Sequence, residues 1–438
     1  MSAARPIPWD IYEEHLDEAA FLWGQWEFAL DAPTFALDDV IIGPEERLLA
    51  HLDGLVLGGA RVAEKLLVPA LADDDPGKVT AAAWALVQAE DADHLDAVLE
   101  SLRKADKKET RAAIAQALAC CHRADLPARL LPLMGTSPPA IQAVIVDVVS
   151  ARTAAGAASP LPIETLLTTR NPELLAAALR ALRRAPKPDC ASLIEPALAS
   201  PYVAVREAAI EAGVLLGVRG AWQACNKLVA RNAGGSRLPL ALLALGGELA
   251  DLNTVIKRLG VEDLRRDALW ALGFSGTSEA AEAALGLIDD DDLGKRAGES
   301  FTTITGLPIS GALTKAGETD NTSPPELEDD DAPLPVVKPE DGLPTPNGEK
   351  IRAWWEKAKG QLQPGVRYLY GQPATAEAMR QAIEIGPTWR RRVWLLEIAA
   401  RTGIDLDLGG WARDQKNALS RFPAGLRLDR GLVALAKA

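Results

Sequence analysis

The side chains with the greatest chemical capacity in this chain are its four histidines and four cysteines. Their densest group is Cys120, Cys121 and His122, and thiolate and imidazole are common ligands of zinc. Consecutive residues of a helix point about 100° apart, so these three side chains cannot all reach one ion. The group therefore predicts no metal site.

Spacings typical of enzymes are also missing from the sequence. It contains no C-x-x-C pair, H-E-x-x-H helix, phosphate-binding loop, G-x-S-x-G turn or dinucleotide fingerprint. His15 stands among acidic residues, as is typical of a solvated helix face: Glu13, Glu14, Asp17 and Glu18. We therefore predict that the protein is not an enzyme and has no catalytic, cofactor-binding or metal-binding residues.

Two acidic turns resemble each other, LADDDPGK at 71–78 and LIDDDDLGK at 287–295. Their spacing does not match a calcium-binding EF-hand loop. Carboxylates are favoured at helix N-termini, where they cap free amide groups and oppose the helix dipole. We predict that both runs are helix-capping turns.

Helical repeats account for most of the chain. A small–x–x–small–large pattern places its second small position at 85, 117, 148, 181, 212, 244, 271 and 300, in steps of 27–33 residues. Positions i, i+3 and i+4 share one helix face, and small side chains there allow a neighbouring helix to approach closely. The pattern predicts an all-α fold, an α-solenoid of about eight HEAT-like repeats.

Four regions are expected along the chain. They are an aromatic-rich helical N-terminal cap at 1–59, the HEAT-like repeat array at 60–313, an acidic, Pro-rich disordered linker at 314–350, and a basic, Trp-rich helical module at 351–438. In the cap, the spacing predicts one helix over 11–30, ended by Pro33, and a second helix that starts at Pro44.

The charge of the chain limits its partners. Its net charge is −14; residues 351–438 have a balance of +7, and residues 1–350 one of −21. An acidic array repels phosphate backbones, so nucleic-acid binding is left only to the basic module as an alternative. We expect a cytoplasmic protein for three reasons. The cysteines lack the spacing of a disulfide framework, the N-terminus does not resemble a signal peptide, and no apolar run reaches the roughly 20 residues that span a membrane.

One column of residues in the repeated helices is a candidate binding surface. It lies two residues after the first small position, is mostly polar, and is expected to face solvent along a concave groove: Trp84, Gln116, Asp147, Arg180, Glu211, Leu243, Trp270 and Glu299. Candidate partner-binding residues in it are Trp84, Arg180, Glu211 and Trp270, with both tryptophans as anchors. The alternative is that each tryptophan lies against the next repeat.

Arg390 and Arg391, followed by Arg392, form a second candidate surface for a partner between Trp389 and Trp394. The alternative is a helix that simply points its arginines into solvent.

Both ends of the chain show a family resemblance, carried by DEAAFLWGQW (17–26), HLDGL (51–55) and WW…QPGVRYLYGQP…RRRVWLLEIA (354–399). These segments resemble an uncharacterised family of bacterial HEAT-repeat proteins that are often encoded in type VI secretion gene clusters, near spike, PAAR and effector-adaptor genes. The resemblance implies a protein-binding adaptor or chaperone that assists effector loading, with an effector or spike component as partner, and it transfers no catalytic residue.

A further alternative comes from another class of HEAT-type proteins. Phycobilin lyase-like proteins also use such repeats, and they act on a partner that bears a cofactor. We expect no bilin adduct and no cofactor for this chain.

Overall fold

The computed structural model describes residues 7–89, 91–153, 158–184, 189–232, 237–315, 338–404, 410–423, 425–428 and 432. These residues are mostly helical, and successive helices pack against one another. One short antiparallel hairpin joins β1 (Tyr368–Leu369) to β2 (Gln372–Pro373). No helix in these ranges has the length and apolar character needed to cross a membrane.

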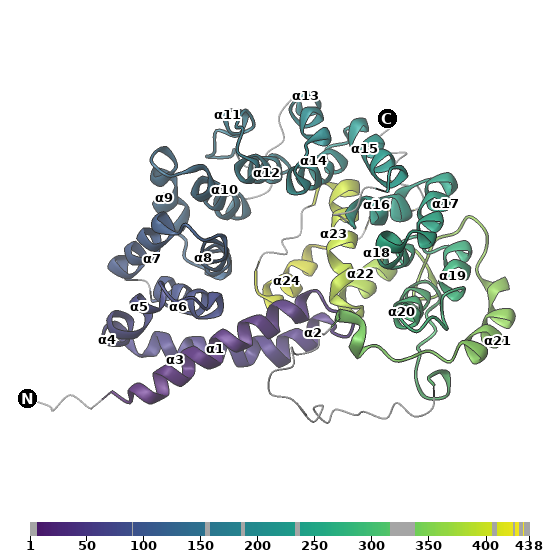
Figure 1. The fold of residues 1–438 in the computed structure, drawn as a ribbon, viewed down its shortest axis with the longest axis horizontal. Helices are drawn as coiled ribbons and strands as arrows, with labels where there is room; N and C mark the ends of the chain where they lie inside the picture. Colours follow the sequence, from purple (N-terminus) through teal and green to yellow (C-terminus); the bar gives the residue numbers. More distant parts are fainter. Residues whose placement is uncertain are drawn as a thin grey trace, which may run out of the picture. The chain divides into compact units, whose positions relative to one another are not determined.

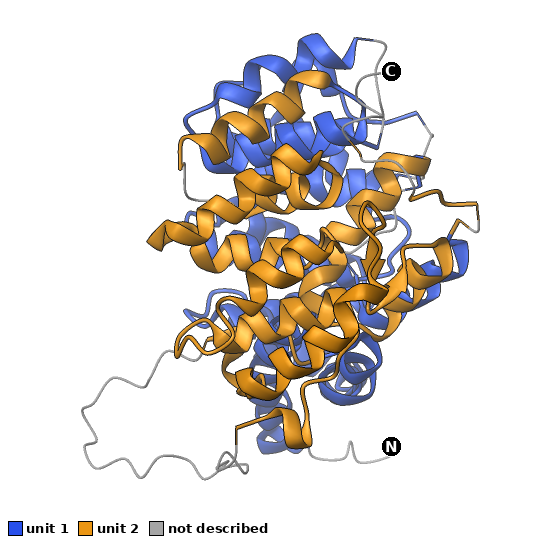
Figure 2. Cartoon of the chain, turned by 90° about the vertical axis from the view of Figure 1, so that its right-hand side faces the viewer, with its two compact units in different colours: residues 1–31, 35–218, 403–422 blue, residues 32–34, 219–402, 423–438 orange. Residues whose placement is uncertain are grey.

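The chain forms two compact units, coloured separately in Figure 2. Unit 1 comprises residues 1–31, 35–218 and 403–422, and unit 2 comprises 32–34, 219–402 and 423–438. This division differs from the four regions expected from the sequence. The predicted repeat array at 60–313 is divided between the two units near residue 218. The segment 351–438 contributes to both units.

Unit 1 consists of helices and short helical turns. Its longer helices are α1 (Trp9–Leu30), α3 (Glu46–Leu57), α6 (Pro76–Gln88), α7 (Ala92–Lys104), α8 (Lys108–Cys120), α10 (Pro139–Arg152), α12 (Pro172–Leu182) and α14 (Val203–Leu215). Its shorter elements are α2 (Leu37–Val40), η1 (Ile41–Glu45), α4 (Gly59–Val62), η2 (Ala63–Leu67), α5 (Val68–Ala70), α9 (Leu126–Leu130), η3 (Leu131–Gly135), α11 (Ile163–Leu166), α13 (Cys190–Ile194), η4 (Glu195–Ala199), α24 (Ala412–Ala418) and η9 (Leu419–Arg421).

The repeated helices of unit 1 pack in the order of the sequence. α6, α8, α10, α12 and α14 follow one another side by side (Figure 1), and α1 packs on α6. The small residues of the repeat lie in these contacts, because Ala85, Ala117 and Ala181 are all 0% exposed. Small side chains at these positions let the helix backbones come close, as the repeat pattern predicted.

The N-terminal helices agree with the sequence only in part. α1 ends at Leu30, before Pro33, as predicted. The prediction that a second helix starts at Pro44 is wrong, because helical structure begins at Leu37 and runs through Pro44. Pro44 lies in the π-helical turn η1, whose wider hydrogen-bond spacing accommodates a residue without an amide hydrogen. The same turn places Glu45 in the interior, fully buried.

The first acidic turn caps a helix, as predicted. Asp75 precedes α6, and its Oδ1 accepts a hydrogen bond of 2.8 Å from the backbone amide of Gly77. In the second acidic turn Asp290 instead closes the turn, accepting from the amides of Asp292 and Leu293 at 3.0 and 2.9 Å. The helix that follows starts at Gly294 without a side-chain cap.

Unit 2 contains the remaining elements. They are α15 (Arg219–Ala230), α16 (Leu238–Gly246), α17 (Leu249–Lys257), η5 (Arg258–Gly260), α18 (Glu262–Leu272), α19 (Ser278–Leu285), α20 (Gly294–Thr305), η6 (Gly311–Leu313), η7 (Pro339–Gly342), α21 (Gly348–Ala358), η8 (Lys359–Gln361), the β1–β2 hairpin, α22 (Ala376–Ile385) and α23 (Thr388–Thr402). α16, α18 and α20 pack in sequence order, and α23 packs on α16.

The linker predicted to be disordered over 314–350 is ordered at its C-terminal end. Residues 316–337 lie outside the described residues, whereas 338–350 form η7 and the start of α21. Glu340 of η7 is 3% exposed and binds both Arg266 and Arg296. Burial acts to raise the pKa of Glu340, but the charge and hydrogen bond of Arg296 outweigh it and lower that pKa. The composition of the segment predicts disorder, since composition does not show that Arg266 and Arg296 pair with Glu340.

Candidate functional site: a polar cavity beside four tryptophans

Four indole rings gather in the interior of unit 1, around Trp411 at the start of α24. The ring centroids of Trp23, Trp26 and Trp84 lie 5.6, 5.1 and 5.9 Å from that of Trp411. All four side chains are at most 3% exposed. Tilted and edge-to-face contacts of this kind add to the stabilisation that burial provides.

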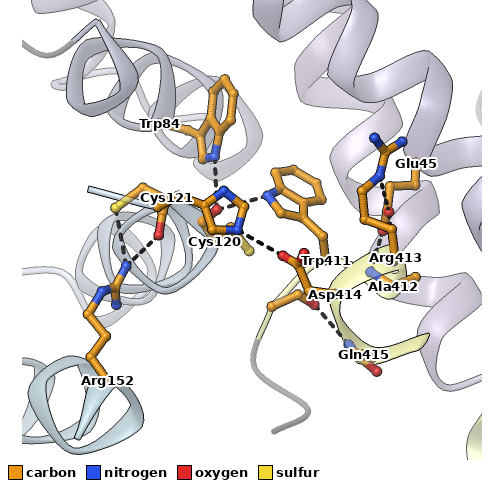
Figure 3. A network of polar contacts seen from close by, with 12 residues as sticks. Glu45, Trp84, Cys120, Cys121, Arg152, Trp411, Ala412, Arg413, Asp414 and Gln415 are labelled. Carbon is orange, nitrogen blue, oxygen red and sulfur yellow. Dashed lines mark hydrogen bonds and ion pairs between the residues drawn. The ribbon is translucent and has the colours of Figure 1, made fainter. Parts of the chain in front are cut away.

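The indoles are also fixed by hydrogen bonds. Trp84 and Trp411 both donate from Nε1 to the carbonyl oxygen of Cys120, at 3.3 and 2.8 Å (Figure 3). Cys120 is the last residue of α8, so this carbonyl has no partner within its helix. The expectation that Trp84 is exposed in a groove is therefore wrong, because the C-terminal segment covers it with Trp411.

A buried carboxylate positions α24. Glu45 is fully buried, and its Oε2 accepts from Nε1 of Trp26 at 2.9 Å and from the backbone amide of Ala412. Its Oε1 accepts from the amide and Nε of Arg413, at 3.0 and 3.2 Å. A carboxylate at a helix N-terminus satisfies free amides and opposes the helix dipole. Glu45 thereby links η1 to the N-terminus of α24.

A polar cavity of about 580 Å³ adjoins this cluster. Its charged lining comes from the segment after α8, from the end of α10, and from α24 and η9: His122, Arg123, Arg152, Asp414 and Arg421. The side chains of Cys121 and Gln415 also line it. His122 Nε2 lies 2.9 Å from Asp414 Oδ2.

Positive side chains outnumber carboxylates in the cavity lining, although Arg123 pairs with Asp125 at 2.7 Å. Arg152 donates to the carbonyl oxygen and Sγ of Cys121, the former at 2.6 Å (Figure 3). It also donates to the carbonyl oxygen of Leu118 at 2.7 Å. Those acceptors carry no formal charge, so these hydrogen bonds do not neutralise the guanidinium. Arg421 is exposed at the cavity. Asp414 is the one carboxylate among the lining residues. The cavity is thus suited to an anionic group.

Two candidate residues of the predicted column connect neighbouring repeats instead. Arg180 of α12 forms a two-point ion pair with Asp147 of α10, at 2.9 and 2.6 Å. Glu211 of α14 is 6% exposed and binds Arg183, the residue that follows α12. At these positions the column lies between successive helices. Its charged side chains pair within the chain there, so their polar character does not require a partner protein.

The other predicted residues lie in the interior of unit 2, so the expectation that they are exposed is wrong. Trp270 is 1% exposed, and its ring contacts those of Phe274 and Trp389, with centroids 4.7 and 6.4 Å away. Arg390 and Arg391 are 0% and 3% exposed. Burial lowers the pKa of Arg391 to about 10.

Arg390 is the centre of a buried polar group. Its Nε donates to Glu299 Oε1 at 2.6 Å, its Nη2 binds Glu299 Oε2, and its Nη1 donates to the carbonyl of Trp270 at 3.0 Å. Nε1 of Trp389 also donates to Glu299. A Cβ at Gly273 would lie 2.5 Å from the guanidinium, so the glycine makes room for it. This arrangement is structural, since both charges are already paired.

A second cavity, of about 330 Å³, lies within unit 2. Its lining is largely apolar, with Ile309, Leu343 and Ile385 among its residues, and its buried carboxylate is the already paired Glu299. It has fewer groups that would select a ligand than the cavity of unit 1.

Three of the four cysteines, Cys120, Cys121 and Cys225, are buried, and Cys190 is half-buried. All four are free thiols. Burial raises the pKa of the Cys120 thiol well above its usual value, which keeps it protonated and unreactive. No sequence motif marks the other residues of the candidate site, which are Glu45, Arg152, Trp411, Asp414 and Arg421.

Comparison with models of protein families and with curated proteins gives no match to this chain.

Proposed function

We propose that this protein is a non-enzymatic protein-interaction scaffold that holds an acidic segment of a partner in the cavity of unit 1. The observation that carries the proposal is the local reversal of charge. In a chain with a net charge of −14, Arg152 and Arg421 line this cavity beside Arg123, which pairs with Asp125, and His122, which pairs with Asp414. Carboxylates of a partner would pair with Arg421 and Arg152. Complementary charge speeds the association of two proteins and fixes how they align.

The scaffold itself is proposed to be an α-solenoid of about eight HEAT-like repeats. The repeat spacing in the sequence supports this, as does the ordered packing of α6 to α14 within unit 1 and of α16 to α20 within unit 2. Repeats of this kind mostly serve as binding surfaces.

A more specific role is proposed from the sequence resemblance alone. It is that of an adaptor or chaperone that assists loading of type VI secretion effectors in the cytoplasm. Affinity purification of the full chain from its source cells, followed by mass spectrometry, should then recover an effector or spike component. Recovery of proteins unrelated to secretion, with none of these components, would contradict this role while leaving the cavity proposal intact.

Arg421→Glu tests the cavity directly. We expect it to weaken binding of a fluorescein-labelled ten-residue poly-glutamate peptide by about tenfold, because it places a like charge against the ligand. Fluorescence anisotropy with the full chain measures this, and binding to the wild type should weaken as salt is added. Asp414→Asn removes the carboxylate from the lining and should tighten binding.

The matched control is Arg103→Glu. Arg103 is a half-exposed residue of α7 that does not line the cavity, and the substitution changes the net charge equally. Equal weakening by Arg103→Glu and Arg421→Glu would show a general charge effect and refute the cavity. Tighter binding of single-stranded DNA than of the peptide would favour nucleic acid as the ligand.

A further inference from the structure

Two of the four histidines meet within unit 1. His15 of α1 and His51 of α3 are both partly buried, and their Nδ1 atoms are 3.0 Å apart. The ring centroids are 5.0 Å apart, and the rings are steeply inclined at 72°. The sequence had suggested a solvated helix face for His15, but this ring faces a second imidazole.

The separation of these nitrogens suits shared coordination of one metal ion. Two nitrogens bound to Zn²⁺ at about 2.0–2.1 Å with tetrahedral angles lie about 3.3 Å apart. Bringing Nδ1 of His15 and Nδ1 of His51 to that separation requires a shift of only a few tenths of an ångström from 3.0 Å. Neutral imidazole is a preferred ligand of zinc, copper and nickel.

The surroundings of the pair hold one ring closely and place charges of both signs near the other. His15 packs over Gly54, where a Cβ would lie 3.0 Å from Nε2, so α3 holds the ring closely. Glu18 and Glu14 of α1 and Arg47 of α3 all act electrostatically on His51.

We propose that His15 and His51 form a site for a divalent transition-metal ion of the zinc type, which joins α1 to α3. Within the described residues no group of three or more His, Cys, Asp or Glu side chains is placed to hold a metal ion, so the proposed site has two protein ligands. The two helices carry structural parts of the candidate site, because α1 bears Trp23 and Trp26 and α3 continues from Glu45. Bound metal would therefore stabilise the region that positions α24.

Isothermal titration of the full chain with ZnCl₂ tests the proposal. We expect one ion per chain, and we expect His15→Gln and His51→Gln each to weaken its binding by more than about tenfold. Zn²⁺ should also raise the midpoint of thermal unfolding of the wild type but not of either variant. His94→Gln and His122→Gln are the matched controls, since they remove the other two histidines, and both should bind as the wild type does.

A measurement on the wild type guards against variants that fail to fold. Electron paramagnetic resonance of the chain with one equivalent of Cu²⁺ should show two imidazole nitrogens bound to the same ion. A single imidazole in this spectrum, or Zn²⁺ affinity unchanged by His51→Gln, would overturn the proposal. Loss of binding in His122→Gln alone would place the ion at the cavity and overturn it equally.

Discussion

Arg390→Ala is expected to lower the free energy of unfolding by about 3–5 kcal/mol, the cost of leaving one partner of a buried ion pair alone. Arg390 is fully buried and meets Glu299 through Nε and Nη2. Without the guanidinium, the Glu299 carboxylate keeps only neutral donors, including Nε1 of Trp389. Urea unfolding followed by far-ultraviolet circular dichroism measures the loss.

The matched control is Arg380→Ala on the neighbouring helix α22. Arg380 pairs with Glu377 and Glu384 at the surface, so its removal should leave the urea midpoint almost unchanged. The double variant Arg390→Met with Glu299→Gln removes both charges and should recover much of the stability lost in Arg390→Ala. Equal midpoints for the two single alanine variants would show that the buried pair contributes little.

The local features of this fold were predictable because they depend on neighbouring residues. Spacing by three and four residues identified the buried faces at Ala85, Ala117 and Ala181, and Asp75 with Pro76 marked the start of α6. The free cysteines followed from their context in Ala-rich helices. Such signals act within one or two helical turns, so one sequence suffices to detect them.

The candidate site was not predictable, because long-range packing creates it. Trp411 meets Cys120, 291 residues away in the sequence, and Arg390 meets Glu299, 91 residues away. A polar or aromatic residue beside an apolar helix face is indistinguishable from a solvent-facing one until the covering segment is placed. Trp84 and Trp270 were misassigned to the surface for this reason.

Because Trp411 makes long-range packing contacts, we expect its substitution to reduce stability more than that of any other aromatic residue of unit 1. Trp411→Ala is expected to lower the free energy of unfolding by about 3–5 kcal/mol, the usual cost of deleting a buried tryptophan. It removes contacts with Trp23, Trp26 and Trp84 and a 2.8 Å hydrogen bond to the Cys120 carbonyl. Urea unfolding of the full chain measures this.

Phe21→Ala provides the matched control, because Phe21 of α1 is 61% exposed and should cost less than about 0.5 kcal/mol. Trp411→Phe should fall between the two, since it keeps much of the ring packing and loses the hydrogen bond. Trp411→Ala should also abolish binding of the poly-glutamate peptide, because Asp414 and Arg421 follow Trp411 in the same segment. Peptide binding that survives in a folded Trp411→Ala chain would separate the cavity from the tryptophan cluster and contradict the role of Trp411 in placing it.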